Sequence, residues 1–419
     1  MNDKIKTNIG NHEVLENLYR SDRKAFKTAF KNVYPEIENH EAAKFWKTRL
    51  DYDDRDDILK SFSAKEIFMV ISVCFITAFL IKIPDIFSLN IPEDIFFFRN
   101  GALIVFLGLA LYRTLIKGIS KPERMASAAI IFLASALYIN LLPSGENGAA
   151  IRLAYIHLPL LIWFLFGFVY TGCDFRSHEK RIDFIRYNGD LAIVYALIAI
   201  AGGLLSAFTI GLFDSIGLNI EEFYSRNIIL TGAVSAPVVA AYIIEKFPAL
   251  VSRIAPLITA IFSPLVLVTL IIFLIAVAVT GKDPYNNRDF LLVFNLMLLG
   301  VMGIIIFSVS ESSAIRNQKF NSLILLSLSV AAIITDLIAL SAIFYRLGEY
   351  GVTPNRLAVV VSNLLVLANL ILITADLIRI NFKAKEFKIV EITVSKFLPV
   401  YLLWILIVVF GFPFIFGIK

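Results

Sequence analysis

Long apolar runs separated by short charged loops dominate the chain after residue 66. A helix that crosses a bilayer needs about 20 mostly apolar residues. Eleven segments meet this requirement, at about 67–87, 98–116, 125–142, 153–172, 190–213, 227–244, 257–279, 289–309, 322–345, 357–378 and 397–417. Strands of an outer-membrane barrel alternate in polarity and span only about 10 residues, so they are excluded. The pattern predicts an all-α, polytopic transmembrane helix bundle of about 11 spans.

The first 65 residues have a different pattern. Apolar side chains recur at helical spacing between basic residues, at Leu15, Leu18, Tyr19, Phe26, Phe30 and Val33. Pro35 is predicted to end this helix, and "HEAAKFWKTRL" to begin a second one. The sequence therefore predicts a cytoplasmic helical hairpin at 1–65 and a transmembrane domain at 66–419. The hairpin packs on the inner loops in one interpretation; a membrane-surface anchor or a docking site for a protein partner are the alternatives.

Basic residues are unequally divided between the two sets of loops. Loops after even-numbered spans carry the larger share, with Lys117, Lys121, Arg124, Arg176, Lys180, Arg181, Arg186, Lys246, Arg253, Arg316, Lys319, Arg379, Lys383, Lys385, Lys388 and Lys396. The opposite loops carry Arg99, Arg152, Arg226, Lys282, Arg288, Arg346 and Arg356. Loops rich in Lys and Arg stay in the cytoplasm, which predicts a cytoplasmic N-terminus and, with an odd number of spans, an external C-terminus.

Two stretches of the chain resemble each other. "ITAFLIKIPDIFSLNI" at 76–91 aligns without a gap with "LSAFTIGLFDSIGLNI" at 205–220, and an Arg-Asn pair follows each, at Arg99 and Arg226. A fainter copy lies at "RLGEYGVTPNR", 346–356. These matches predict repeat units at about 66–189, 190–320 and 321–419, with four, four and three spans. Units with an even number of spans keep one orientation, so the repeats are predicted to be parallel.

The repeated stretches also carry predicted helix caps and charges. Asn90, Asn219 and Thr353 are predicted N-caps, the last followed by a proline at the first helical position. Arginines follow near the outer N-terminal helix ends, where the helix dipole disfavours positive charge, and acids lie nearby: Arg99 with Asp85 and Glu93, Arg226 with Asp214 and Glu222, and Arg356 with Glu349. We call the three arginines, together with Asp85, Asp214 and Glu349, the outer crown. Either ion pairs fix the outer loops, with Glu349–Arg356 the pair most expected, or the crown contacts a ligand, an anion or a partner.

Composition supports a membrane location. Hydrophobic residues make up 58% of the chain and charged residues 17%, and the mean hydropathy is +0.77, which excludes a soluble domain of this length. The net charge of +5 does not indicate nucleic acid, because inner loops of membrane proteins are basic. The expected partners are therefore the lipid bilayer and a small-molecule or ion substrate.

Catalytic and cofactor motifs are missing from the sequence. It contains no phosphate-binding Gly-rich loop, no HExxH and no GxSxG. The four histidines are scattered and form no metal set, and Cys74 and Cys173 suggest neither a disulfide nor a zinc site. We expect no cofactor and no metal, and the sequence favours a protein that is not an enzyme.

Ionisable groups at bilayer depth are the remaining signal. Asp336 lies near the middle of the ninth span in "AAIITDLIALSA", and Asp376 lies one turn before Arg379 at the end of the tenth. A charge at this depth is costly unless it is paired, hydrated or protonated. Arg379 accounts for Asp376 as a structural residue. Asp336 is either a proton- or cation-coupling group or a buried polar contact between helices.

The octapeptide "EYGVTPNR" resembles the signature of a family of bacterial multi-pass inner-membrane proteins, domain-of-unknown-function family 4153. Glu349, Tyr350, Gly351, Thr353 and Arg356 are the matching positions, and "LYRSDRKAFKTAFKNVYPEI" with "FWKTRL" resembles the cytoplasmic lead-in of some members. The resemblance implies this fold class and a bacterial inner-membrane location, and no activity.

Three functional classes remain open. A transporter or permease would use a polar path with Asp336 as its anchor, and the sequence favours this class slightly. A scaffold or sensor would use the N-terminal hairpin and the outer crown. An integral-membrane enzyme acting on lipid-linked substrates would need clustered acids or a nucleophile at one interface. A water-accessible cavity reaching Asp336 favours the first class, and dry packing around it favours the second.

Overall fold

The structure, a computed structural model, describes residues 1–54, 63–89, 91–118, 122–143, 148–215, 218–280, 288–311, 318–383 and 385–417. All regular elements within these ranges are helices. Eleven helices are long and apolar enough to cross a membrane, which confirms the predicted all-α architecture and number of spans. The chain divides into two compact units, Met1–Phe68 and Met69–Lys419.

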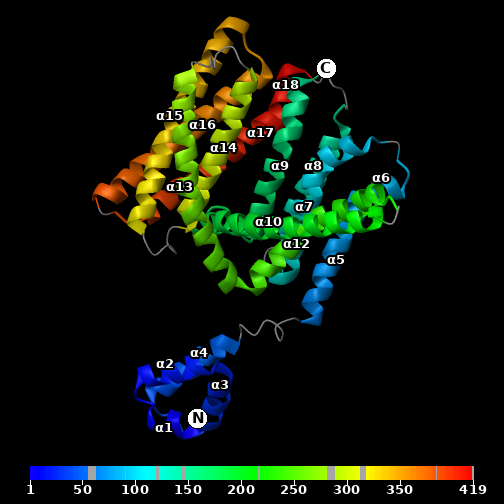
Figure 1. Ribbon diagram of the computed structural model, residues 1–419. Helices are drawn as coiled ribbons and strands as arrows, with labels where there is room; N and C mark the ends of the chain where they lie inside the picture. Colours follow the sequence, from blue (N-terminus) through cyan, green and yellow to red (C-terminus); the bar gives the residue numbers. More distant parts are fainter. Residues whose placement is uncertain are drawn as a thin grey trace. The chain divides into compact units, whose positions relative to one another are not determined.

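The first unit is a small bundle with its own core. Its helices are α1 (Asn2–Thr7), α2 (His12–Ser21), α3 (Arg23–Ile37) and α4 (Glu41–Asp54) (Figure 1). Trp46 and Phe26 are almost completely buried, with ring centroids 5.1 Å apart. The predicted hairpin is wrong in its helix boundaries. Asp22 accepts a hydrogen bond from the Ala25 amide at 2.9 Å and so starts a new helix.

Pro35 does not end α3, which continues to Ile37. Proline removes one backbone hydrogen bond and crowds the preceding turn. Here it lies within the last turn of the helix, and the helix continues for two residues beyond it. The helix therefore ends after Pro35 and not at it.

The contacts of Glu16 predict that the stability of the first unit depends on pH. The hydrogen bond from Arg20, aided by Arg49, holds the pKa of Glu16 below its usual value of 4.5. A carboxylate with a lowered folded pKa stabilises the fold above its unfolded pKa, and this stabilisation is lost as the pH falls through the folded value. We expect Glu16→Gln to lower hydrogen-exchange protection of α2 and α4 at neutral pH, with a difference from wild type that shrinks below about pH 4.5. Glu13→Gln is the control; an equal loss in Glu13→Gln, or a difference independent of pH, contradicts this prediction.

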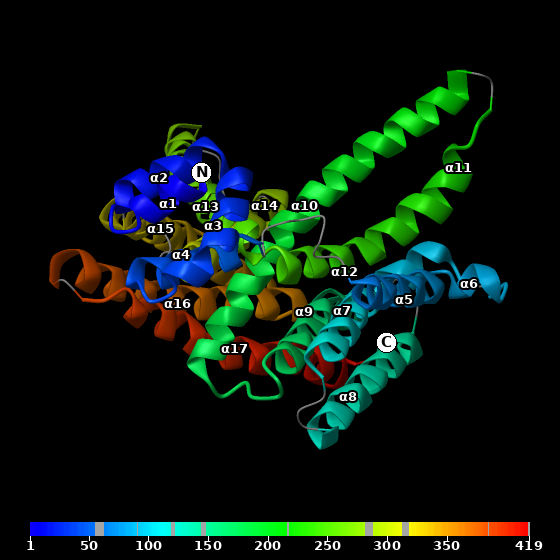
Figure 2. The ribbon, with the colours of Figure 1, turned by 90° about the horizontal axis from the view of Figure 1, so that it is seen from below.

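The second unit contains the remaining helices (Figures 1 and 2). They are α5 (Ala64–Ile81), which begins in the first unit, α6 (Ile83–Ile86), α7 (Glu93–Lys117), α8 (Pro122–Leu141), α9 (Ala149–Tyr170), α10 (His178–Ser215), α11 (Glu221–Tyr224), α12 (Leu230–Lys246), α13 (Pro248–Thr280), α14 (Arg288–Glu311), α15 (Gln318–Tyr350), α16 (Pro354–Lys383), α17 (Lys388–Leu406) and α18 (Phe412–Phe416). Two π-helical segments, Ser225–Ile229 and Ile407–Gly411, join α11 to α12 and α17 to α18.

Helix α10 connects the parts of this unit. It begins at His178, well before the predicted start of the span at 190. Its first half is buried at Phe184 and Leu191 and packs on α12, α14 and α17. Its second half exposes apolar side chains such as Leu204 and Phe208, and Figure 2 shows it extending, together with α11 and the segment leading into α12, away from the remaining helices. The first half therefore joins the helices, and the second half presents a surface for lipid.

Glycine permits two of these helix contacts. A Cβ at Gly189 of α10 would overlap the ring of Phe307 of α14. A Cβ at Gly167 of α9 would lie 2.7 Å from the ring of Phe184 of α10. Small residues let membrane helices approach closely, so α9, α10 and α14 meet at these positions.

The predicted caps have different outcomes. Thr353 accepts a hydrogen bond from the Arg356 amide at 3.3 Å, and α16 starts at Pro354, as predicted. Asn219 accepts from the Glu221 amide at 3.1 Å, but the N-cap of α11 is Ile220, so the predicted cap is wrong by one residue. Asn90 lies outside the described residues. Helix α7 begins at Glu93 after Pro92 without a side-chain cap, because Pro92 itself occupies the capping position.

Candidate functional site

Arg356 does not pair with Glu349. Its guanidinium donates hydrogen bonds to the backbone carbonyls of Tyr350 and Gly351, both at 2.7 Å, and lies 5.4 Å from the Tyr350 ring. No ion pair joins Arg356 to Glu349 in the described part of the chain. Gly351 has a φ of +72°, which glycine tolerates, and turns the chain from α15 into α16. The family-like octapeptide is thus a helix-to-helix connector in which Arg356 closes the end of α15.

Arg99 also donates hydrogen bonds to backbone carbonyls at the end of a helix. It donates to the carbonyls of Asn140 at 3.3 Å and Leu142 at 3.2 Å, at the C-terminal end of α8. The ring of Tyr155 lies 5.1 Å from its guanidinium. The end of a helix carries unpaired carbonyls and partial negative charge. Arg99 and Arg356 each lie near the start of one helix but neutralise the end of another, which resolves their poor fit with their own helix dipoles.

The rest of the outer crown is dispersed. Asp85 pairs with Lys82, not with Arg99. Arg226 pairs with Glu222 at 3.4 Å, while Asp214 is exposed. Among the described side chains, the predicted pairing of an acid with an arginine is found between Glu222 and Arg226. Arg99 and Arg356 donate to backbone carbonyls instead, and the six crown residues do not form one cluster of ion pairs.

Arg356→Lys is expected to weaken the connector, because the shorter lysine side chain does not reach the Nη1 position that donates both hydrogen bonds and has no planar group to place over the Tyr350 ring. Losing such a hydrogen bond costs about 1 kcal/mol. We expect faster hydrogen exchange in residues 350–356 and a lower melting temperature than in the control Arg346→Lys. Equal exchange in the two variants contradicts this structural role.

Asp336 is the most isolated buried acid in the described residues. Its exposure is 0%, and neither carboxylate oxygen has a hydrogen-bond partner there. It lies on α15 within electrostatic range of Tyr401 of α17. Asn369 of α16 donates to the Tyr401 hydroxyl at 2.9 Å, and its own Oδ1 has no hydrogen-bond partner. Two buried groups with unused acceptor oxygens therefore share the phenol of Tyr401 as a neighbour.

Two other polar residues that the sequence places in the spans have partners. Asp376 accepts from Arg379 at 2.9 Å and from Thr393 at 2.5 Å, which agrees with the predicted structural role. Asn363 donates to Asn295 at 2.7 Å. Asp336 differs from both in that neither of its carboxylate oxygens has a partner among the described residues.

A large apolar cavity lies beside Tyr401. Its volume is about 990 Å³, and side chains of α9, α10, α13, α14, α16 and α17 form its wall. Several wall residues remain highly exposed, including Leu160, Ile200 and Phe262. We call this space the apolar cavity. It opens among exposed apolar side chains, which would face lipid in a membrane.

Asp336 does not form part of this wall, whereas Tyr401 does. The carboxylate itself is fully buried, and its link to the apolar cavity is the wall residue Tyr401, which lies within electrostatic range of it. Polar groups in the wall already have partners: Trp404 donates to Ser362 at 2.9 Å, and Trp163 donates to Asn188 at 2.8 Å. His157 is also in the wall, with Nδ1 2.8 Å from the Leu153 carbonyl.

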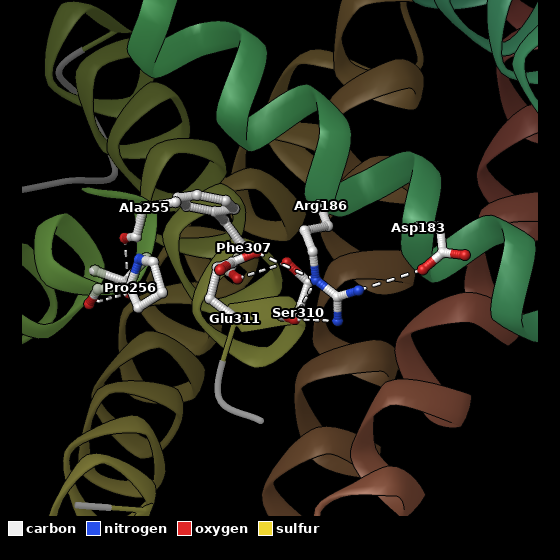
Figure 3. A network of polar contacts seen from close by, with 8 residues as sticks. Asp183, Arg186, Ala255, Pro256, Phe307, Ser310 and Glu311 are labelled. Carbon is white, nitrogen blue, oxygen red and sulfur yellow. Dashed lines mark hydrogen bonds and ion pairs between the residues drawn. The ribbon is translucent and has the colours of Figure 1, made fainter. Parts of the chain in front are cut away.

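A polar network at the α10–α14 contact was not predicted. Arg186 donates two hydrogen bonds to the Ser310 carbonyl, at 2.7 and 3.0 Å, and one to Asp183 at 3.2 Å (Figure 3). Its Nε is also 3.3 Å from Oε1 of Glu311, which is 96% buried. Asp190 lies within electrostatic range of Glu311. Sequence reasoning placed these residues in loops or at span ends; the spacing of Arg186 and Asp190 along one helix was the available signal.

A second hollow adjoins this network. The polar hollow has a volume of about 790 Å³ and lies between the start of α10 and the start of α17, with Asp183, Arg186, Lys388 and Glu391 in its wall. Along α10, Arg186 lines the polar hollow and the preceding Ile185 lines the apolar cavity. The two spaces therefore follow one another along α10 and α17, with the Arg186 network between them.

Comparison with known proteins adds no relative: no family model, curated protein or solved structure matches the chain. Within the described ranges, no group of three or more His, Cys, Asp or Glu side chains is placed to hold a metal. The two cysteines are not bonded to each other.

Proposed function

We propose that this protein is a permease that moves an apolar or amphipathic solute through the apolar cavity, with Asp336 as its proton-carrying residue. One observation carries the proposal. The buried, unpartnered carboxylate of Asp336 neighbours Tyr401, and Tyr401 forms part of the cavity wall. The proposal keeps the slight preference for transport that the sequence gives, although the packed surroundings of Asp336 meet the criterion stated above for a scaffold or sensor.

The energetics of burial support a proton at this position. An ionised carboxylate at bilayer depth costs a few kcal/mol or more unless it is paired, hydrated or protonated. In the described residues, Asp336 has no pairing cation and no donor. Protonation removes the charge of the Asp336 carboxylate. Movement of Tyr401 would then link the binding or release of this proton to the contents of the apolar cavity.

A flux screen tests this function. Purified wild type is reconstituted in liposomes under a pH gradient and offered apolar and amphipathic solutes that are neutral, cationic or anionic. We expect accumulation of at least one class in wild type and its loss in Asp336→Asn. Asp214→Asn, an exposed acid outside the site, should behave as wild type. Equal accumulation by wild type and Asp336→Asn removes Asp336 from the mechanism.

A scaffold or sensor is the second candidate, favoured by the packed surroundings of Asp336 and by the separate core of the first unit. The two functions differ in their dependence on residues 1–54. A permease should retain flux when these residues are deleted, whereas a scaffold would show no flux in any form and would lose its cellular role on deletion. For the enzyme class, the described wall of the apolar cavity contains no pair of carboxylates, and its Ser362 hydroxyl accepts a hydrogen bond from Trp404.

We further propose the finer features of the sequence prediction: parallel repeats of four, four and three spans, a bacterial inner-membrane location, a cytoplasmic first unit and an external C-terminus. Membership of domain-of-unknown-function family 4153 belongs with these proposals. The unequal division of basic residues supports the orientation. A topology reporter after Lys419 should be external, and a cytoplasmic signal would contradict the orientation.

The repeat proposal requires the first four spans to superpose on the next four without inversion.

A further inference from the structure

We propose that the solute of the apolar cavity is a lipophilic cation, and that Glu311 and Asp190 attract its charged group at the α10–α14 end of the cavity. This inference rests on the proposed function and names its substrate class. It follows from the position of the two carboxylates, from their unmet hydrogen bonding and from the chemistry of the cavity wall.

Both acids adjoin wall residues. Phe307 of α14 lines the cavity, and Glu311 lies four residues further along the same helix. Residues four apart share one helix face, and Figure 3 shows both side chains at the Arg186 network. On α10, Gly189 lines the cavity and Asp190 is the next residue. Neither acid is itself in the described wall, so both lie behind wall residues, at the α10–α14 contact.

Arg186 forms an ion pair with Glu311 but leaves one oxygen of each acid without a hydrogen bond. Its Nε and one terminal nitrogen donate to the Ser310 carbonyl, and the other terminal nitrogen donates to Asp183. Oε1 of Glu311 consequently lies near the guanidinium without a hydrogen bond, and Oδ1 of Asp190 also has none in the described structure. A buried acceptor without a donor costs about 1–3 kcal/mol. Three carboxylates share one guanidinium, so the local charge balance is negative.

The wall of the cavity favours the same ligand. Six aromatic side chains line it: Trp163, Phe164, Phe262, Phe307, Tyr401 and Trp404. Aromatic faces attract cations, most strongly where water is excluded. The described wall contains no Lys or Arg. The cavity therefore combines apolar surface and aromatic faces with a negative end, a combination that attracts a lipophilic cation and repels an anion of the same size.

A matched pair of probes tests this inference. Tetraphenylphosphonium and tetraphenylborate have nearly the same size and apolar surface but opposite charge. Binding of each to the purified full-length protein in detergent is measured by equilibrium dialysis. We expect saturable binding of the phosphonium and at least about tenfold weaker binding of the borate, since close charge contacts are worth a few kcal/mol.

Variants connect the charge preference to the site. Glu311→Gln and Asp190→Asn should each weaken phosphonium binding by about tenfold and leave borate binding unchanged or stronger. Glu179→Gln, an exposed acid of the polar hollow, is the control and should bind as wild type. If one site variant does not fold, the other still tests the inference.

Two results would overturn the inference: equal binding of the two probes by wild type, or unchanged phosphonium binding in both site variants. Equal binding would indicate a space occupied by lipid chains without charge selection. Failure of the proposed function looks different, because charge-selective binding without flux leaves this site intact and removes only the permease.

Discussion

Replacing Gly303 with tryptophan is expected to abolish solute accumulation while the protein remains folded. Gly303 of α14 lies in the wall of the apolar cavity, and a Cβ at this position would meet no atom within 4 Å. The indole would therefore extend into the cavity without displacing its neighbours. Since the solute and the indole compete for one space, we expect the affinity for the solute to fall about tenfold or more, as is common when a central contact in a binding site is lost.

Gly211→Trp is the matched control for this substitution. Gly211 also has open space around it but lies on the exposed half of α10, outside the cavity wall. Both variants should melt close to wild type, because substitutions at open positions usually change stability by no more than about 0.5 kcal/mol. Normal accumulation by Gly303→Trp would show that the cavity is not the route.

Asp336→Asn is expected to eliminate proton-driven accumulation without destabilising the fold. Asparagine has nearly the size of aspartate but carries no titrating proton. Because Asp336 has no partner in the described structure, its replacement breaks no existing hydrogen bond, and a neutral group at bilayer depth costs less than a charge. The accumulation ratio under a pH gradient should fall to that of protein-free liposomes, while the melting temperature stays the same or rises.

Asp376→Asn should destabilise the fold but keep proton-driven accumulation. Asp376 holds Arg379 and Thr393 by hydrogen bonds, and removing one partner of a buried charged contact costs about 1–3 kcal/mol. We expect a lower melting temperature with proton-driven accumulation retained by the folded fraction. If both variants lose stability and coupling alike, the distinction between a coupling acid and a structural acid is wrong.

The spans were predictable because membrane insertion depends on local apolar length. The boundary errors have local causes that hydropathy does not register. Asp22 caps a new helix inside a continuous apolar pattern, and α10 begins at His178 in a polar stretch that the structure buries against α17.

The contacts of the outer crown were less predictable, because the sequence argument paired each arginine with an acidic side chain. Arg99 and Arg356 bind backbone carbonyls at helix ends, and every residue has a carbonyl, so sequence does not mark the acceptor. Glu311 was missed because its partner Arg186 is distant in sequence and the predicted span ended at 309. The apolar cavity depends on the packing of six helices, which apolar periodicity does not determine.

Proton exchange on ligand binding tests the central claim most directly. Purified protein in weakly buffered detergent solution receives a solute that the flux screen identifies, and the released or absorbed protons are measured against bound ligand. We predict a change approaching one proton per bound solute in wild type and Asp214→Asn, and none in Asp336→Asn, because linkage requires the titrating group. The same proton change in Asp336→Asn as in wild type would contradict the claim that Asp336 couples the contents of the cavity to a proton.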